Sequence, residues 1–189
     1  MGALVLGALS FFVTAFSDEW GVRRKRPGAG VFFAAGSLLL TAATLWLLAE
    51  SPRPAWPWAV LGGAVALPGL GLLLYTLFFA LPRGGSKPVP AAAADKLPLV
   101  DNGVFALCRH PGVLWLGMWY LGVWIACRTL ATGAAFFLFT GLDTLYVFWQ
   151  DRCVFPQSID DYAAYQARVP FLVPNRRSWH ACFSTFSKP

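Results

Sequence analysis

The residues best suited to chemistry lie between Leu99 and Gly117, in the run LVDNGVFALCRHPGVLWLG. Arg109 and His110 stand directly before Pro111, a residue that favours the first turn of a helix. A helix start offers unpaired N–H groups to an anion, and a guanidinium can fork onto the same anion. We therefore predict that Arg109 binds a carboxylate or a phosphate.

Two acidic residues near the end of a long apolar run form the second candidate group. Asp151 follows this run, and its carboxylate can accept from ribose hydroxyls or from an amino group. Asp143 lies inside the run, where an ionisable residue is by default functional or paired; a hydrogen bond to a facing Ser, Thr or Trp is the alternative. Tyr146 and Gln150 follow at helical spacing, which predicts an inward polar stripe.

The composition is that of an all-α integral membrane protein. Of the 189 residues, 57% are hydrophobic and 13% are charged. The net charge of +6 comes from bases beside apolar segments, which favours contact with anionic lipid and argues against a nucleic-acid partner. The four cysteines form no close pair and no CxxC motif, so we expect no metal site and no disulfide framework.

One transmembrane domain, residues 1–189, accounts for the apolar pattern. We predict about five spans, at about 2–22, 30–49, 57–81, 112–127 and 130–149. The last two form a helical hairpin. Pro68, in the middle of the third span, is expected to serve helix packing. The polar, Pro-rich connection 82–102 is either a lid or a plain linker. In the tail, Trp179, Phe183 and Phe186 recur at helical spacing beside Arg176 and Arg177, which predicts an interfacial segment.

The basic residues predict a multi-pass topology. Thirteen of the fifteen Lys and Arg residues fall in the first and third connections and the carboxy-terminal segment. The positive-inside rule makes these cytoplasmic, with the amino terminus outside and the carboxy terminus inside. The bacterial inner membrane is the favoured location, and the endoplasmic reticulum is the alternative.

Two blocks of the chain resemble the isoprenylcysteine carboxyl methyltransferase and phospholipid methyltransferase superfamily. The block 99–117 keeps the family's Leu-Val, Gly, Arg-His-Pro and Leu-Gly positions, with Phe105 standing for a Tyr. The block 150–174 keeps the family pattern at Asp160-Asp161-Tyr162, Tyr165, Val169-Pro170 and Pro174. It departs from the family where Gln150-Asp151 replaces a pair of acids and Ser158-Ile159 replaces Phe-Gly.

This resemblance implies a membrane-embedded methyltransferase that uses S-adenosylmethionine on a lipid-like or prenylated acceptor, with carboxyl O-methylation favoured over N-methylation. Arg109 and Asp151 are its implied catalytic residues. The implied cofactor contacts are Asn102, Gly103, Phe105, His110, Pro111, Gly117, Asp151, Tyr162 and Tyr165. For the acceptor we single out Trp115, Trp119 and Asp143, although lipid-facing packing is an alternative for the two indoles.

Two other functions remain open at this stage. The Arg-His-Pro block and the later Tyr and Val-Pro run are also similar to membrane sterol reductases, which implies NADPH and hydride transfer. Those enzymes carry about twice as many spans, which counts against this alternative. A non-catalytic relative that binds a lipid or a partner is the other alternative, and the single acid at Asp151 keeps it open. The oligomeric state is not indicated.

Overall fold

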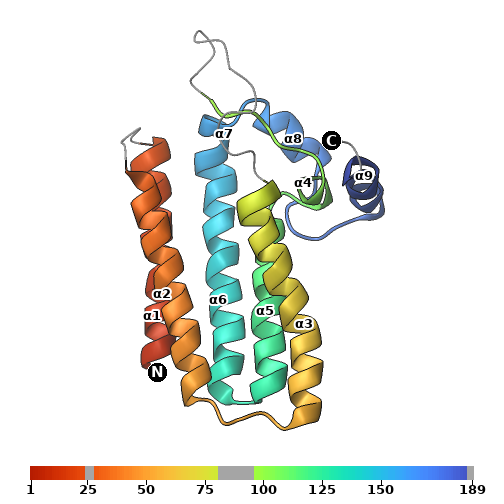
Figure 1. Ribbon diagram of the computed structural model, residues 1–189. Helices are drawn as coiled ribbons and strands as arrows, with labels where there is room; N and C mark the ends of the chain where they lie inside the picture. The colour runs from red at the N-terminus through yellow and green to blue at the C-terminus, as the bar shows by residue number, and fades with distance from the viewer. Residues whose placement is uncertain (24–27, 81–95, 187–189) are drawn as a thin grey trace.

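The computed structural model describes residues 1–23, 28–80 and 96–186. All named secondary-structure elements in this part of the chain are helices. Five long helices run side by side (Figure 1): α1 (Gly2–Asp18), α2 (Ala29–Glu50), α3 (Trp56–Tyr75), α5 (Pro111–Cys127) and α6 (Leu130–Trp149). Four short helices gather at one end and are called the cap: α4 (Val104–Leu107), α7 (Phe155–Ser158), α8 (Tyr162–Arg168) and α9 (Arg176–Phe186). The connections 51–55 and 128–129 lie at the opposite end, called the far end.

The helices follow the predicted apolar runs closely and confirm an all-helical chain. Four of them are long and apolar enough to cross a membrane: Gly2–Gly21, Ala29–Glu50, Trp56–Ala80 and Leu130–Ser158. The fifth apolar helix, Pro111–Cys127, is shorter at 17 residues. Five apolar helices therefore stand where we predicted five spans, and four of these meet the length for a span.

Helix α6 lies between α1 and α5, with α2 packed on α1 and α3 packed on α5. Small residues let α3 and α5 approach closely. A Cβ added at Gly122 would strike the backbone of Gly62 and Ala66, and one added at Gly69 would lie 2.8 Å from Met118 Cβ. Close approach through small residues is a common way for membrane helices to associate. Pro68 lies inside α3 but is exposed, and its neighbour Gly69 makes the close contact, so the packing role predicted for Pro68 stays a prediction.

The core joins α1, α2, α5 and α6. Phe139 contacts Phe11 and Tyr120, at ring-centroid distances of 6.2 Å and 5.0 Å. Tyr120 is buried, and its hydroxyl forms a 2.6 Å hydrogen bond with the Thr44 hydroxyl of α2. This bond satisfies the two polar groups inside an otherwise apolar core.

The predicted hairpin between α5 and α6 is present at the far end. Arg128 adopts φ 55°, ψ 32°, and ends α5. Thr129 then starts α6, where its side chain accepts from Thr132 N and the Thr132 side chain accepts from Thr129 N. This capping box makes a two-residue connection possible.

Three helices that run toward the cap end in a π-helical turn. These turns are Glu19–Arg23 after α1, Thr76–Ala80 after α3 and Gln150–Val154 after α6. The last one carries Asp151. The predicted basic cluster 23–26 and the predicted connection 82–102 lie largely outside the described residues.

Candidate functional site

The Asp151 side chain is the centre of a buried polar group at the cap. Its Oδ1 accepts from Arg109 Nε at 2.9 Å, from His110 Nε2 at 3.1 Å and from the Tyr162 hydroxyl at 2.7 Å. Its Oδ2 accepts from Arg109 Nη2 and from Gln166 Nε2, both at 3.0 Å. We call these five residues the Asp151 cluster. They bring the start of α5, the end of α6 and helix α8 together.

Arg109 also ties the chain that follows α8 to the start of α5. Its Nη1 donates to the carbonyl oxygens of Gln166 and Val169, each at 2.9 Å. The Arg109 main-chain N–H donates to Pro170 O. The guanidinium therefore neutralises a buried carboxylate and satisfies two main-chain acceptors. Both functions are structural, because buried charges and carbonyls need such partners.

His110 is buried between two aromatic rings. Its ring stacks on Phe155 at a centroid distance of 5.8 Å and meets the edge of Phe171 at 5.0 Å. Burial lowers the pKa of His110 below its usual value, although the Asp151 carboxylate opposes this shift. The imidazole is therefore neutral at pH 7. Its Nε2 carries the hydrogen, because an ionised carboxylate only accepts.

The two tyrosines of α8 face the cap interior. Burial and the hydrogen bond to Asp151 raise the pKa of Tyr162, so this phenol stays protonated and donates. Burial likewise raises the pKa of Tyr165, whose hydroxyl donates to the Phe105 carbonyl oxygen at 2.7 Å. Helix α8 is thereby bonded both to the Asp151 cluster and to α4.

The loop before α4 is held from the carboxy-terminal helix. Gly103 has φ 55° and ψ −128°, a conformation that favours glycine, and its N–H donates to Thr185 Oγ1 of α9 at 3.0 Å. Cys182 of α9 is buried against Ala106 and Leu107 of α4. Helix α9 therefore covers α4.

A polar atom without a partner lies beneath this cover. Trp115 packs against the cluster of Ala106, Leu107 and Cys182, and its buried Nε1 has no hydrogen-bond acceptor among the described residues. Such an orphaned donor is unusual in a native interior and indicates a missing acceptor. Asn102, just before α4, is exposed.

Helix α9 has the two faces predicted for an interfacial segment. Ser178 and Cys182 are buried, whereas Trp179 and Phe183 are exposed and stack on each other at 5.6 Å. Arg176 is also exposed. Nothing is described of the Phe186 side chain.

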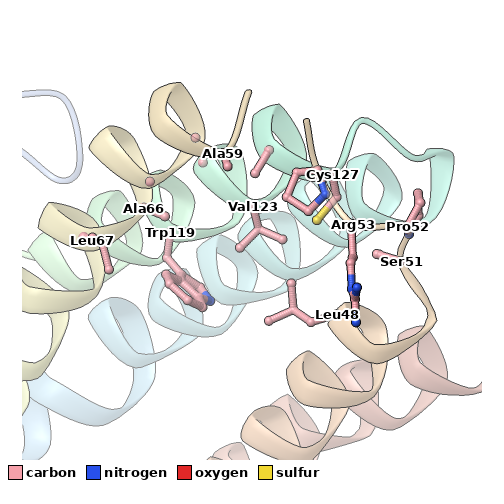
Figure 2. A pocket seen from close by; sticks show the side chains of 15 residues that line it. Leu48, Ser51, Pro52, Arg53, Ala59, Ala66, Leu67, Trp119, Val123 and Cys127 are labelled. Carbon is pink, nitrogen blue, oxygen red and sulfur yellow. The ribbon is translucent and has the colours of Figure 1, made fainter. Parts of the chain in front are cut away.

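Three predicted residues lie away from the Asp151 cluster. Gly117 is about two turns into α5, where a Cβ would lie 3.4 Å from Thr140 of α6. Trp119 lines an apolar cavity toward the far end (Figure 2). Asp143 is half-buried on α6 and makes no hydrogen bond with any described residue. These three residues belong to helix faces separate from the cap, and their predicted contacts with cofactor or acceptor stay predictions.

The polar stripe predicted after Asp143 is present in part. The Tyr146 hydroxyl donates to Asp18 Oδ2 of α1 at 2.6 Å, and Gln150 Nε2 donates to the same oxygen at 2.7 Å. Asp143 is not joined to this group by a hydrogen bond. The stripe therefore links α6 to α1.

Gln166 and Phe171 are members of the site that we did not predict. Gln166 Nε2 donates to both the carbonyl and the carboxylate of Asp151. The spacing of four residues from Tyr162 was a usable signal, because residues at that spacing share one helix face. Phe171 gave no such signal, since it follows α8 in irregular chain.

The Asp151 carboxylate has no acceptor capacity left. Five donors share its two oxygens, which offer about four lone-pair positions. A ribose hydroxyl would have to displace one of these donors, so the geometry suits Asp151 as a positioning residue. No group of three or more metal-ligating side chains occurs among the described residues.

Comparisons with known proteins do not assign the chain to a family. No family model, curated protein or solved structure matches it.

Proposed function

We propose that this protein is a membrane-embedded methyltransferase that uses S-adenosylmethionine and acts on a lipid-like or prenylated carboxylate. The single observation that carries the proposal is the meeting of Arg109, Asp151 and Tyr162 from three segments at one end of a helix bundle. These segments are the ones that resemble the methyltransferase superfamily. When bound, the cofactor would supply a methyl group on a positively charged sulfur.

The unused polar groups around α4 suit such a cofactor better than the saturated Asp151 does. Among the described residues Trp115 Nε1 is an unpaired buried donor, and the exposed Asn102 stands just before α4. A donor suits the carboxylate of the cofactor, and an amide suits its hydroxyls. Phe105 is half-buried between them in sequence and offers an aromatic face.

The Asp151 cluster supports a carboxylate acceptor over an amine or a hydroxyl. An amine or a hydroxyl needs a general base at neutral pH, whereas a carboxylate does not. Asp151 already accepts five hydrogen bonds, and the His110 Nε2 hydrogen is donated to it. Asp151 is therefore saturated. The remaining lone pair of His110, on Nδ1, belongs to a ring buried between Phe155 and Phe171, so neither group presents an exposed base to an acceptor. The cluster then acts by fixing α5, α6 and α8, which aligns and desolvates the reactants.

Ligand-induced thermal stabilisation tests the proposal. Purified protein in detergent is titrated with S-adenosylhomocysteine and, separately, with NADPH. We expect stabilisation of about 2.7 kcal/mol by S-adenosylhomocysteine at a hundredfold excess over its Kd, and none by NADPH. Stabilisation by NADPH alone would support the reductase, and stabilisation by neither would support a non-catalytic relative.

Two variants locate the binding site without disturbing the Asp151 cluster. Trp115→Phe removes the orphaned donor and keeps an aromatic ring, so S-adenosylhomocysteine should bind about fivefold more weakly. Asn102→Ala should have a similar effect. Trp119→Phe, the same change farther along α5, should bind like the wild type. Transfer of a tritiated methyl group into a membrane lipid extract, separated by class, then identifies the acceptor.

A further inference from the structure

The apolar cavity that Trp119 lines lies between α2, α3 and α5, away from the cap (Figure 2). Its volume is about 380 Å³. Most of its walls are apolar side chains and glycines. They come from the end of α2, the far-end connection 51–55, the first half of α3 and the second half of α5: Leu48, Pro54, Ala59, Gly63, Val123 and Cys127 among others.

Two adjacent glycines explain why the cavity exists. Gly62 faces α5, where a Cβ would strike Gly122 O. Gly63, the next residue, points away from that contact, and a Cβ there would meet nothing within 4 Å. Helix α2 packs on α1 and contributes only its end, at Leu48, to the cavity wall, so no described residue fills the space in front of Gly63.

An open apolar cavity on a membrane helix bundle needs an apolar occupant. Its walls offer few groups to bind water, and an empty space would leave their atoms without van der Waals partners. In a bilayer the available apolar chains are lipid tails. The volume falls within the range typical of ligand sites.

Arg53 adds a charge to the rim of this cavity. It is exposed and has no acidic partner among the described residues. Figure 2 shows its side chain extending along the cavity beside Leu48. The other far-end cation, Arg128, lies over the Trp58 ring at 4.2 Å, and Glu50 accepts from Trp46 Nε1. Arg53 is therefore complementary to a phosphate at the membrane surface.

We propose that this cavity binds one acyl chain of an anionic phospholipid, with its phosphate held by Arg53. The site is at the far end and uses no residue of the Asp151 cluster. It is independent of the proposed methyltransferase function, since a bundle with any activity would present the same cavity and charge.

Native mass spectrometry of the detergent-purified protein tests this assignment. The full chain is titrated with phosphatidylglycerol and with phosphatidylcholine of the same acyl chains, and the fraction of protein with one bound lipid is measured. Gly63→Leu fills the cavity. Gly71→Leu is the matched control, because Gly71 also lies on α3 with nothing within 4 Å of its added Cβ but does not line the cavity. Arg53→Gln removes the charge.

We expect the wild type and Gly71→Leu to retain phosphatidylglycerol in preference to phosphatidylcholine. Gly63→Leu should lose binding of both lipids several-fold. Arg53→Gln should weaken phosphatidylglycerol about fivefold and phosphatidylcholine less, because the choline cation already offsets the phosphate charge of phosphatidylcholine. Equal binding by Gly63→Leu and Gly71→Leu would overturn the site, and equal affinity of the wild type for the two lipids would overturn the role of Arg53. A dimer in the wild type that Gly63→Leu converts to monomer would show that a second copy occupies the cavity.

Discussion

Asp151 is the residue on which the cap depends most. Its side chain is only 3% exposed and pairs with Arg109, which is 12% exposed. Removing one partner of a buried pair leaves the other charge without compensation, whereas the pair itself adds little net stability. The effect of a substitution therefore depends on which groups it leaves unpaired.

The variant Asp151→Asn should lower the free energy of unfolding by about 3–5 kcal/mol, because Arg109 loses its counter-charge and an amide NH₂ faces other donors. Denaturant titration of the detergent-purified protein measures this change. Asp160→Asn is the control: Asp160 is exposed, and its replacement should change the free energy by less than about 0.5 kcal/mol. Similar unfolding of both variants would show that the cluster contributes little to the fold.

His110 gives the cap a dependence on pH. Its pKa in the folded protein is below the ordinary value of about 6.5, so between these two values the unfolded chain binds a proton that the folded chain does not. The stabilisation is complete above about pH 6.5 and is lost as the pH falls. We expect the free energy of unfolding to decrease by up to about 1.4 kcal/mol per pH unit in that window.

The chain has only one other histidine, His180, which is exposed and serves as the control. His110→Gln should flatten the pH profile of unfolding just below about pH 6.5. His180→Gln should keep the wild-type slope. A wild-type slope in His110→Gln would mean that another group carries the proton uptake.

Among the helices, α3 and α5 pack most tightly on small residues, and their contact limits which side chains α3 tolerates. Gly62 and Gly63 are neighbours, yet one lies against the backbone of α5 and the other faces open space. An extra group in a well-packed core lowers the free energy of unfolding by about 1–3 kcal/mol. A clash with main-chain atoms is harder to relieve than a clash with a side chain, which can change its rotamer.

We expect Gly62→Val to prevent a folded, monodisperse protein and Gly63→Val to be tolerated. The two substitutions add the same atoms at adjacent positions of one helix, so helix propensity and hydropathy are matched. Size-exclusion chromatography of the expressed proteins in detergent compares them. Equal recovery of the two variants would show that α3 and α5 can separate.

The helices were predictable from sequence and the contacts of the site were not. Prolines or charged residues flank the apolar runs that form α2 (Ala29–Glu50) and α5 (Pro111–Cys127) and set their ends. The bond between Arg109 and Asp151 joins residues 42 positions apart and depends on how α5 and α6 pack. We predicted that both would serve one site but assigned each to a ligand, because sequence spacing does not show that they saturate one another.

For the whole molecule, the placement of basic residues predicts how the chain crosses the membrane. Five spans put the two termini on opposite sides, whereas four spans put them on the same side. The 17 residues of α5 are within the range that can cross a bilayer, at its lower limit.

Reporter fusions at the two termini distinguish these topologies. We expect an amino-terminal reporter to be active outside and a carboxy-terminal reporter to be active in the cytoplasm. Single cysteines placed at Arg53 and Arg128 in a cysteine-free background should be labelled by an impermeant reagent from outside, and one at Arg152 should not. Labelling of the cysteines at positions 53 and 152 from the same side of the membrane would contradict the five-span topology.

The hydrogen bond from Gly103 N to Thr185 Oγ1 has a consequence for biosynthesis. Its acceptor lies in α9, the last described helix, and the donors Tyr162 and Gln166 follow the long helix α6. The long helices precede the cap helices α7 to α9 in the chain and can enter the bilayer while translation continues, but the cap can close only after α9 has left the ribosome. A newly made chain therefore passes through a stage in which Arg109 and Asp151 are present before α8 supplies their hydrogen-bond partners.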